Sequence, residues 1–360
     1  MSLSIGIVGL PNVGKSTLFN ALTNNNILAA NYPFATIEPN TGIVPIPDIR
    51  LNKLAELYKT DKIIPATVTF VDIAGLVAGA SQGEGLGNQF LSHIRTCNAI
   101  CQVVRAFKDD NVVHVDNEYS AKKDIETINT ELVLADLQTV EKQLPKLQKE
   151  VKANPKLKLK FDALIKAKKL LNDNIPLFQA KDLDFDIEQI NDSQLISAKP
   201  IIYIFNIDEN GLTDTNRKNE LSKIVAPSKA LFVCAKLESE LNGLDENDAK
   251  ELLESYGQNE SGLNQIIHEA YSVLGLQSYL TAGEKEVRAW TIAKGATAPQ
   301  AAGVIHGDFE RGFIAADIVD YQDLMGSGSL ANARANGKVR LEGKTYVMQS
   351  DDVVEFKFNV

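Results

Sequence analysis

The stretch that decides the fold class of this chain is GLPNVGKST, residues 9–17. It follows a short apolar run, SIGIV at residues 4–8, which is typical of a buried strand, and it precedes LFNALT, whose apolar residues have helical spacing. A GxxxxGK[ST] loop between a strand and a helix is the pattern that cradles phosphate groups. The sequence therefore predicts an α/β fold of the P-loop NTPase type, with a G-domain architecture.

The residue types in this loop match that chemistry. Gly9 and Gly14 let the backbone turn its N–H groups toward phosphate oxygens, and the helix that begins near Lys15 adds the positive end of its dipole. Lys15 is predicted to reach the β- and γ-phosphates as a catalytic residue, and Ser16 to offer a hydroxyl to Mg²⁺. The expected nucleotide-binding residues of the loop are Asn12, Val13, Gly14, Lys15, Ser16 and Thr17.

Asn12 has two interpretations that the sequence leaves open. In a subset of P-loop NTPases, an asparagine at this position helps to hold a potassium ion beside the phosphates. An asparagine in a loop can equally hydrogen-bond to its own backbone. Mg²⁺ is therefore the expected cofactor, and K⁺ is a second candidate.

Two further segments follow in the order that a G-domain needs. Thr36, in NYPFAT at residues 31–36, is the candidate for a hydroxyl that binds Mg²⁺ when a γ-phosphate is present. Asp72 directly follows a predicted strand at residues 66–71 and is the first residue of a DxxG motif. It is therefore expected to hold Mg²⁺ through water. Gly75 offers the γ-phosphate a backbone N–H. The next residue, Leu76, stands where many GTPases place a glutamine, and it has no group that could orient water.

His114 is the candidate for handling the attacking water. It lies in NVVHV, residues 111–115, after a predicted strand at residues 99–106. A histidine there can position water or stabilise charge near the γ-phosphate. The spacing alone favours a loop histidine without a chemical role.

The base-reading segment is NIDE, residues 206–209, which stands where a GTP-reading protein carries Asn-Lys-x-Asp. An aspartate accepts both adjacent donors of guanine, whereas Glu209 is one methylene longer and Ile207 replaces the lysine. The amide of Asn206 complements the donor and acceptor edge of adenine. Ala235, in Cys234-Ala235-Lys236, is expected to line the same pocket. These residues predict ATP over GTP by roughly 1–2 kcal/mol, the scale of one base-edge contact.

A different pattern begins at Asp124. Apolar residues recur at spacings of three to five up to Val151, and a second helical pattern spans residues 157–171, so the sequence predicts an antiparallel helical hairpin with a kink at Pro145. Residues 141–170 hold ten lysines against three acidic residues. This segment is either an arm that seeks RNA phosphates or a helix face kept soluble by lysine.

Composition further restricts the possible partners and cellular location of the chain. The net charge of −10 argues against nucleic-acid binding over the whole surface. The N-terminus lacks the basic region of a signal peptide, and no apolar run is long enough for a membrane span. Three cysteines, Cys97, Cys101 and Cys234, indicate a reducing cytosol. Short strand patterns from residue 279 onward predict a compact mixed β domain.

Taken together, these motifs resemble the YchF family of Obg-like ATPases. The resemblance rests on GLPNVGKST, NYPFATIEPNTG, DIAGLVAGASQGEGLGNQFL, NIDE, KEVRAWTIAKGATAPQAAGVIHGDFERGF and EFKFNV, and it spans essentially the whole chain. It implies a G-domain at residues 1–123 and 199–277, a coiled-coil insertion at 124–198 and a C-terminal TGS domain with a ubiquitin-like β-grasp at 278–360. It also implies preference for ATP, association with the ribosome and a catalytic role for His114.

The function expected from the sequence is that of a monomeric cytoplasmic ATPase that uses ATP to set a conformational switch on the ribosome. Two alternatives stay open. One is a GTPase of the same fold. The other is a scaffold that binds ATP without hydrolysing it, in a stress or redox response, for which Leu76 and the pair Cys97 and Cys101 are the only hints.

Overall fold

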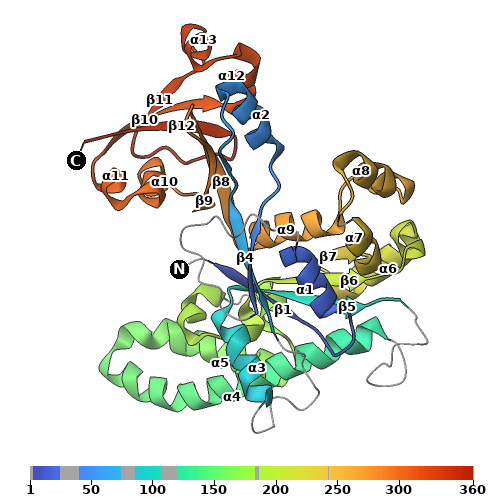
Figure 1. Cartoon of the computed structure of the whole chain (residues 1–360). Helices are drawn as coiled ribbons and strands as arrows, with labels where there is room; N and C mark the ends of the chain where they lie inside the picture. The colour runs from blue at the N-terminus through green and yellow to red at the C-terminus, as the bar shows by residue number, and fades with distance from the viewer. Residues whose placement is uncertain are drawn as a thin grey trace. The chain divides into compact units, whose positions relative to one another are not determined.

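The chain folds into two compact units (Figure 1). The computed structural model describes residues 3–24, 40–73, 86–107, 120–182, 186–241 and 243–359. The first unit joins Met1–Ile43 to Thr69–Ala270, and the second joins Val44–Val68 to Tyr271–Val360. The sequence motifs assign residues 44–68 to the nucleotide-binding domain, so their grouping with the C-terminal residues appears only in the structure. The domain boundaries expected from the sequence stay a prediction.

The first sheet has six strands in the order β2-β4-β1-β5-β6-β7. The pairs that join β4, β1, β5, β6 and β7 are all parallel. Strands β5 and β6 are buried along their whole length, as expected for a parallel sheet covered on both faces. The strands span Ser4–Val8 (β1), Thr41–Pro45 (β2), Thr67–Asp72 (β4), Ala99–Arg105 (β5), Ile201–Asn206 (β6) and Lys229–Val233 (β7).

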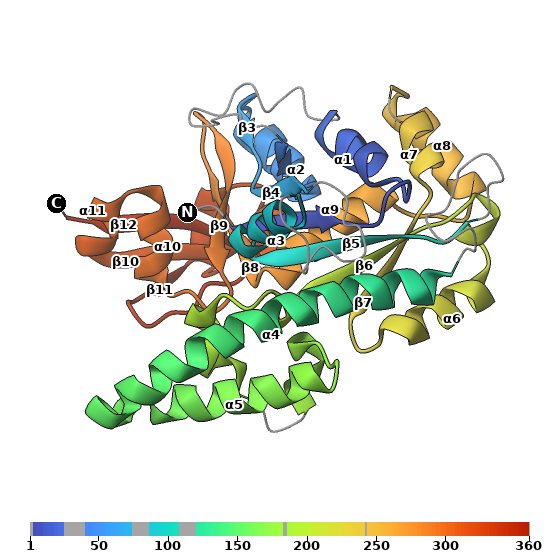
Figure 2. The ribbon, with the colours of Figure 1, turned by 90° about the horizontal axis from the view of Figure 1, so that it is seen from below.

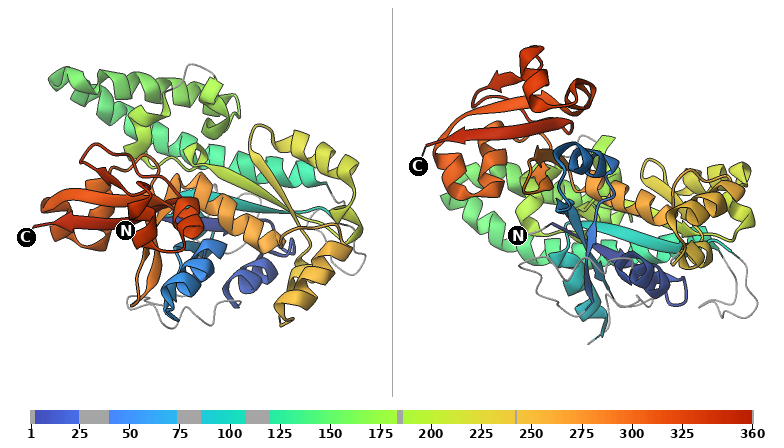
Figure 3. Two further views of the ribbon diagram at one scale, coloured as in Figure 1. Left: turned by 90° about the horizontal axis from the view of Figure 1, so that it is seen from above. Right: turned by 45° about the horizontal axis from the view of Figure 1, so that its top comes forward.

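Helices cover both faces of this sheet. Helices α1 and α7 lie on one face and α4 on the opposite face (Figure 3). The helices that begin in this part of the chain are Lys15–Asn24 (α1), Leu86–Thr96 (α3), Ala121–Ala153 (α4), Lys158–Asn172 (α5), Thr215–Val225 (α6), Ala235–Leu241 (α7), Glu246–Ser255 (α8) and Gly262–Val273 (α9). Short 3-10 turns cover Pro155–Leu157 (η2), Leu177–Asp182 (η3), Ile187–Ser193 (η4), Ile196–Ala198 (η5) and Asn210–Leu212 (η6).

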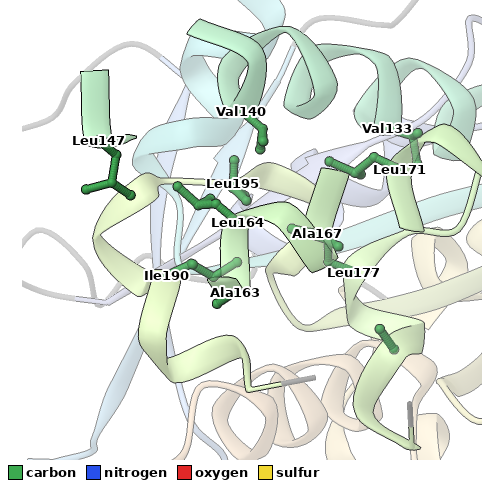
Figure 4. Packing of buried hydrophobic residues seen from close by; sticks show 11 residues of the cluster. Val133, Val140, Leu147, Ala163, Leu164, Ala167, Leu171, Leu177, Ile190 and Leu195 are labelled. Atoms are coloured by element: carbon green, nitrogen blue, oxygen red, sulfur yellow. The ribbon is translucent and has the colours of Figure 1, made fainter. Parts of the chain in front are cut away.

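The helical hairpin predicted from the sequence is present. Helix α4 runs without interruption through Pro145, and α5 returns alongside it after the short turn η2 (Figure 2). Asn154 serves both helices, because its N–H donates to Glu150 O (2.8 Å) and its side chain accepts from Lys156 N (3.2 Å). The two helices and the turns that follow them share an apolar core of their own (Figure 4). Its buried members include Val133, Val140, Leu147, Ala163, Leu164, Ala167, Leu171, Leu177, Ile190 and Leu195.

The second sheet has the order β11-β10-β12-β8-β9-β3. Strands β12 and β8 are parallel neighbours, flanked by the antiparallel pairs β8·β9 and β10·β12. This arrangement is the mixed sheet of a β-grasp fold, so the predicted fold class is confirmed. The strands span Ile63–Ile64 (β3), Leu276–Ala282 (β8), Val287–Ala293 (β9), Phe313–Asp320 (β10), Arg340–Glu342 (β11) and Asp352–Phe358 (β12). Outside the named strands, an isolated antiparallel bridge joins Val347 to Thr297.

Helices complete the second unit. Helix α10 packs on the sheet, where the hydroxyl of buried Tyr279 donates to Ala301 O (3.0 Å). Strand β3 extends the sheet by pairing with β9, and the guanidinium of Arg50 in α2 donates to Ser350 O and to the Asp351 carboxylate, each at 2.7 Å. These contacts hold residues 44–68 in this unit. The helices span Ile49–Tyr58 (α2), Ala298–Ile305 (α10), Gly307–Arg311 (α11), Tyr321–Ser327 (α12) and Leu330–Ala335 (α13).

Candidate nucleotide-binding site

The phosphate-binding loop lies between β1 and α1, as the sequence predicts. Two of its residues adopt left-handed backbone conformations, Asn12 with φ of 63° and Gly14 with φ of 92°. Asparagine tolerates this region, and glycine enters it without steric cost. A side chain at position 14 would also run into the amide of Asn206, so both the backbone and the space around it require glycine there.

Asn206 ties this loop to the far strands of the sheet. Its side chain is buried at the end of β6, where Nδ2 donates to Val13 O (3.0 Å). Its Oδ1 accepts from the backbone N–H of Ala235, at the start of α7 (3.3 Å). The amide therefore holds together the phosphate loop, the end of β6 and the turn after β7. The predicted contact of Asn206 with a base stays a prediction.

Lys15 and Asp72 meet at the carboxyl edge of the sheet. The ammonium of Lys15 lies 2.5 Å from Oδ1 of Asp72, and the two side chains are 10% and 19% exposed. Ser16 and Thr17 are exposed in the first turn of α1. The hydroxyl of Ser16 and the carboxylate of Asp72 are hard oxygen ligands of the kind that Mg²⁺ prefers. The donor set in the described part of the site therefore fits this metal.

The base-reading segment leaves β6 as a turn held by several bonds. The N–H of Ile207 donates to Val233 O (2.9 Å), and its side chain is 2% exposed, so it supports the turn from inside. Glu209 forms an ion pair with Lys236 (2.7 Å), and this hydrogen bond lowers the pKa of Glu209. Contact of these residues with a base stays a prediction.

Asp208 and Arg217 form a link that the sequence did not predict. Asp208 accepts from Gly211 N (2.8 Å) and lies 3.3 Å from the guanidinium of Arg217, which also donates to Ala106 O just after β5. Arg217 thus joins the segment after β6 to the end of β5. Local patterns could not identify it, because nothing in the sequence of α6 indicates a partner more than one hundred positions away.

Several predicted residues lie outside the described residues. They are Thr36, Gly75, Leu76 and His114, and their proposed roles stay predictions. The structure therefore brings together Asn12 through Thr17, Asp72, the segment 206–209 and Ala235 at one edge of the first sheet.

The cysteines have the character of buried apolar residues. Cys97, Cys101 and Cys234 are free and buried, and burial raises the pKa of each thiol. A thiol is reactive mainly as the thiolate. These environments therefore weaken the redox alternative.

A parallel sheet with a phosphate loop after β1, a carboxylate after β4 and a base segment after β6 defines the class of this chain: it is a P-loop nucleotide-binding protein with a G-domain. Residues 4–153 match a family model described as a 50S ribosome-binding GTPase. Residues 276–359 match the model of the C-terminal domain of the YchF GTPase, described as a protein of unknown function.

Comparison with curated proteins and solved structures is more specific. The chain is 50% identical to the ribosome-binding ATPase YchF of Bacillus subtilis (strain 168) and 48% identical to that of Escherichia coli O157:H7, and both alignments cover all of this chain and all of the relative. The solved structure of the Schizosaccharomyces pombe YchF GTPase superposes with a TM-score of 0.86 at 40% identity, covering 99% of this chain and 98% of that one. This chain belongs to the YchF family.

A more distant structure shares the fold. The GTP-binding protein of Pyrococcus horikoshii OT3 has a TM-score of 0.62 at 20% identity, and the match covers 99% of this chain and all of that one. Among the helices of the described residues, none combines the length and the apolar character that a membrane crossing requires.

Proposed function

We propose that this chain hydrolyses ATP to ADP and phosphate and uses the reaction as a conformational switch on the ribosome. Membership of the YchF family and the phosphate loop support nucleotide hydrolysis in general. Relatives from Bacillus subtilis and Escherichia coli are named ribosome-binding ATPases. The observation that carries the proposal is the loop built around Gly14 and Lys15 and fixed by Asn206.

Residues of this chain have distinct roles in the proposed reaction. Lys15 and the backbone N–H groups of the loop stabilise the charge that develops on the transferred phosphoryl group. Ser16 and Thr36 would hold Mg²⁺ directly, and Asp72 would hold it through water. The metal, when bound, neutralises phosphate charge. His114 positions the attacking water, since Leu76 has no polar group. Asn12 is the proposed ligand for K⁺.

The preference for ATP rests on the base segment. The Glu209 carboxylate is already engaged by Lys236 at 2.7 Å, so binding guanine through this group would compete with the ion pair. The names of the relatives differ on this point, because the fission-yeast protein is called a GTPase. Calorimetric titration with ATP and with GTP, in Mg²⁺ and K⁺, tests the preference. We expect ATP to bind about five- to thirtyfold more tightly, which corresponds to roughly 1–2 kcal/mol.

Hydrolysis needs a separate measurement. A single-turnover assay with Mg²⁺, with and without K⁺, is expected to convert bound ATP to ADP. Binding without conversion would favour the non-hydrolysing scaffold. Equal or tighter binding of GTP would favour the GTPase of the same fold. Loss of turnover in His114→Ala, with ATP affinity kept, is the result expected if this histidine handles the water.

The lysine-rich part of the helical hairpin supports ribosomal RNA as the contact. Lys142, Lys146 and Lys149 are exposed and recur at helical spacing on α4, about 4.5–6 Å apart along its axis. Lys146 approaches the carboxylate of Glu150 only at 3.9 Å, which is a weak contact between exposed groups. A row of this kind suits the phosphates of a nucleic-acid backbone.

Co-sedimentation of the chain with bacterial ribosomes tests this contact. Binding is expected, and it should differ between ATP, ADP and no nucleotide. Failure to sediment under all three conditions would contradict the ribosomal role and would leave ATP hydrolysis to be judged by its own assay.

We also propose that the protein is a cytoplasmic monomer with three domains. They are a G-domain at residues 1–123 and 199–277, a coiled-coil insertion at 124–198 and a TGS domain at 278–360.

A further inference from the structure

The last turn of α3 is bonded to the helical hairpin through Arg95. Its guanidinium donates to the backbone oxygen of Gln194 and to the hydroxyl oxygen of Thr139, each at 2.9 Å. Thr139 lies on α4, and Gln194 precedes the return of the chain to the sheet. One side chain of the nucleotide-binding domain therefore holds both the outgoing and the returning segments of the insertion.

Lys199 makes the second connection from the opposite direction. It stands where the chain leaves the insertion and enters β6, and its ammonium is partly buried. That ammonium donates to three carbonyl groups at the end of α3. A cation there satisfies carbonyls that have no partner within the helix and complements the helix dipole. The acceptors are Ile94 O (3.0 Å), Arg95 O (2.7 Å) and Cys97 O.

The base of the insertion is itself held rigidly. The carboxylate of Asp136, which is fully buried on α4, accepts from Ile196 N (2.8 Å) and from both the N–H and the hydroxyl of Ser197 (2.7 Å each). Removing a partner from such a buried group would leave it unpaired at a cost of about 1–3 kcal/mol or more. Ile196 and Ser197, which directly precede the segment that contains Lys199, are therefore bonded firmly to α4.

Just after α3, Cys97 lies close to Gly6, a residue inside β1. At Gly6 of β1, a Cβ would lie 2.6 Å from the side chain of Ile73 and 3.1 Å from the sulfur of Cys97. Ile73 directly follows Asp72, the predicted Mg²⁺ ligand, and Cys97 directly follows α3. The side chains of Ile73 and Cys97 therefore both occupy the space beside the backbone of Gly6.

Where α4 packs on the sheet, three buried polar atoms have no hydrogen-bond partner within the part of the chain that the structure describes. Gln102 is fully buried on β5, and neither its Nε2 nor its Oε1 has a hydrogen-bond partner among the described residues; the same holds for Oδ1 of Asn129 on α4. Gln102 pairs in register with Tyr203, whose hydroxyl accepts from Asn129 at 3.5 Å, so both amides face the contact between α4 and the sheet. Burial without partners raises the energy of this arrangement.

From these contacts we infer that Arg95, Thr139, Gln194 and Lys199, together called the α3 junction, couple nucleotide occupancy to the position of the helical hairpin. Binding at Asp72 shifts Ile73 and the end of α3, and the junction carries that shift to α4. The coupling rests on the proposed function only in requiring that a nucleotide binds. By thermodynamic linkage, the two effects are equal. If nucleotide changes the affinity of the hairpin for a partner by some factor, that partner changes the affinity for nucleotide by the same factor.

Hydrogen–deuterium exchange of the full chain tests the junction, in Mg²⁺ with ATP, with GTP and without nucleotide. In the wild type, nucleotide is expected to change amide exchange at residues 136–153 and 194–199 by at least twofold. Thr139→Val removes the acceptor for Arg95 together with the bond from this hydroxyl to Ala135 O, and Arg95→Met removes both bonds of the guanidinium. Both variants are expected to lose more than half of this change while they keep nucleotide affinity.

The matched control is Thr127→Val. Thr127 lies on the same helix and its hydroxyl donates to Lys123 O at 2.9 Å, just as Thr139 donates to Ala135 O at 2.9 Å. Of these two hydroxyls, Arg95 contacts that of Thr139. This control is expected to behave as the wild type.

Three results overturn the inference. The first is a wild type that binds nucleotide with unchanged exchange in the hairpin, which would leave the proposed function standing. The second is a Thr139→Val variant that responds to nucleotide as fully as Thr127→Val does. The third is a wild type that binds neither ATP nor GTP, which would remove the proposed function as well.

Discussion

At the scale of single residues, Asn206 shows how one side chain can hold a phosphate loop in place, whether or not it also contacts the base. Its amide bridges Val13 O and Ala235 N, which lie on two loops far apart in sequence. Holding a phosphate loop in its binding conformation before the ligand arrives removes an ordering cost from binding. Affinity for ATP should therefore depend on this residue even if the base never contacts it.

Asn206→Ala is expected to weaken ATP binding about tenfold or more, which equals about 1.4 kcal/mol. The reason is that the loop around Gly14 loses its connection to β6. Calorimetric titration with ATP measures the change. Asn216→Ala is the matched control, since Asn216 is exposed on α6 and should leave the affinity as it is. Equal affinity of the two variants would contradict the role given to Asn206.

Gln102→Leu is expected to raise the free energy of unfolding by about 1–3 kcal/mol. The reason is that an apolar side chain of similar size replaces a buried amide that has no hydrogen-bond partner among the described residues. Urea unfolding followed by circular dichroism gives the difference. Gln148→Leu, at an exposed position on α4, should stay within about 0.5 kcal/mol of the wild type. A destabilised Gln102→Leu variant would indicate that the amide is paired in solution.

At the scale of elements, a buried carboxyl group connects two helices at the far edge of the first sheet. Glu238 of α7 is 3% exposed and accepts from Gly262 N, the first residue of α9, at 2.6 Å. A Cβ at Gly262 would lie 2.8 Å from Val233 and 2.9 Å from this carboxyl oxygen, so the position needs glycine. Burial raises the pKa of Glu238 to about 7, against the opposing effect of the backbone hydrogen bonds.

Stability is expected to fall as pH rises because of Glu238. The pKa of Glu238 in the folded state, about 7, lies above the ordinary value of 4.5. The folded protein therefore binds this proton more tightly than the unfolded chain does, and the resulting stabilisation of the fold is fully present below about pH 4.5. This contribution is lost as pH rises through about 7, by at most about 1.4 kcal/mol per pH unit.

Glu238→Gln keeps an acceptor for Gly262 N and removes the titration. Between pH 4.5 and 7, urea unfolding should therefore show the wild type losing stability relative to this variant. Parallel pH profiles for the two proteins would argue that the carboxyl group titrates near its ordinary pKa.

At the scale of the whole molecule, charge is unevenly distributed along the chain. The net charge is −10, yet residues 141–170 hold ten lysines and three acidic residues. Some of these lysines are engaged, since Lys158 pairs with Asp162 at 2.7 Å and Lys168 with Glu141 at 3.0 Å. The exposed row of Lys142, Lys146 and Lys149 remains the part best suited to phosphate groups.

Neutralising that row tests the contact with ribosomal RNA. A Lys142→Gln, Lys146→Gln, Lys149→Gln variant is expected to bind bacterial ribosomes more weakly. The plot of log affinity against log salt concentration has a negative slope, and its magnitude should become smaller by about 2–3. This is roughly one for each phosphate that the lysines no longer neutralise. Co-sedimentation over a salt series measures both. The control neutralises exposed Lys223, Lys250 and Lys344. Identical slopes for the two triple variants would exclude this row as the RNA contact.

Several parts of this protein can be predicted from local pattern in the sequence. GLPNVGKST between an apolar run and a helical repeat predicts strand, phosphate loop and helix, and the structure has them at Ser4–Val8 and Lys15–Asn24. The hairpin of α4 and α5 is predictable for the same reason, because apolar spacing records the helical period. Helix α4 continues through Pro145, the position at which the sequence predicts a kink. A proline removes one backbone donor from the helix. Residues of α4 both before and after Pro145 belong to the core shared with α5, and this packing holds the helix together across the proline.

Tertiary structure alone decided the contacts between residues far apart in the chain. The pairing of β3 with β9, which draws Val44–Val68 into the second unit, joins strands more than two hundred positions apart. The bridge of Asn206 to Val13 and the bonds of Lys199 to the end of α3 likewise depend on which strands become neighbours. Side-chain hydrogen bonds act over about 3 Å. Local spacing therefore specifies each element, but only the order of strands in the sheets brings these partners within reach.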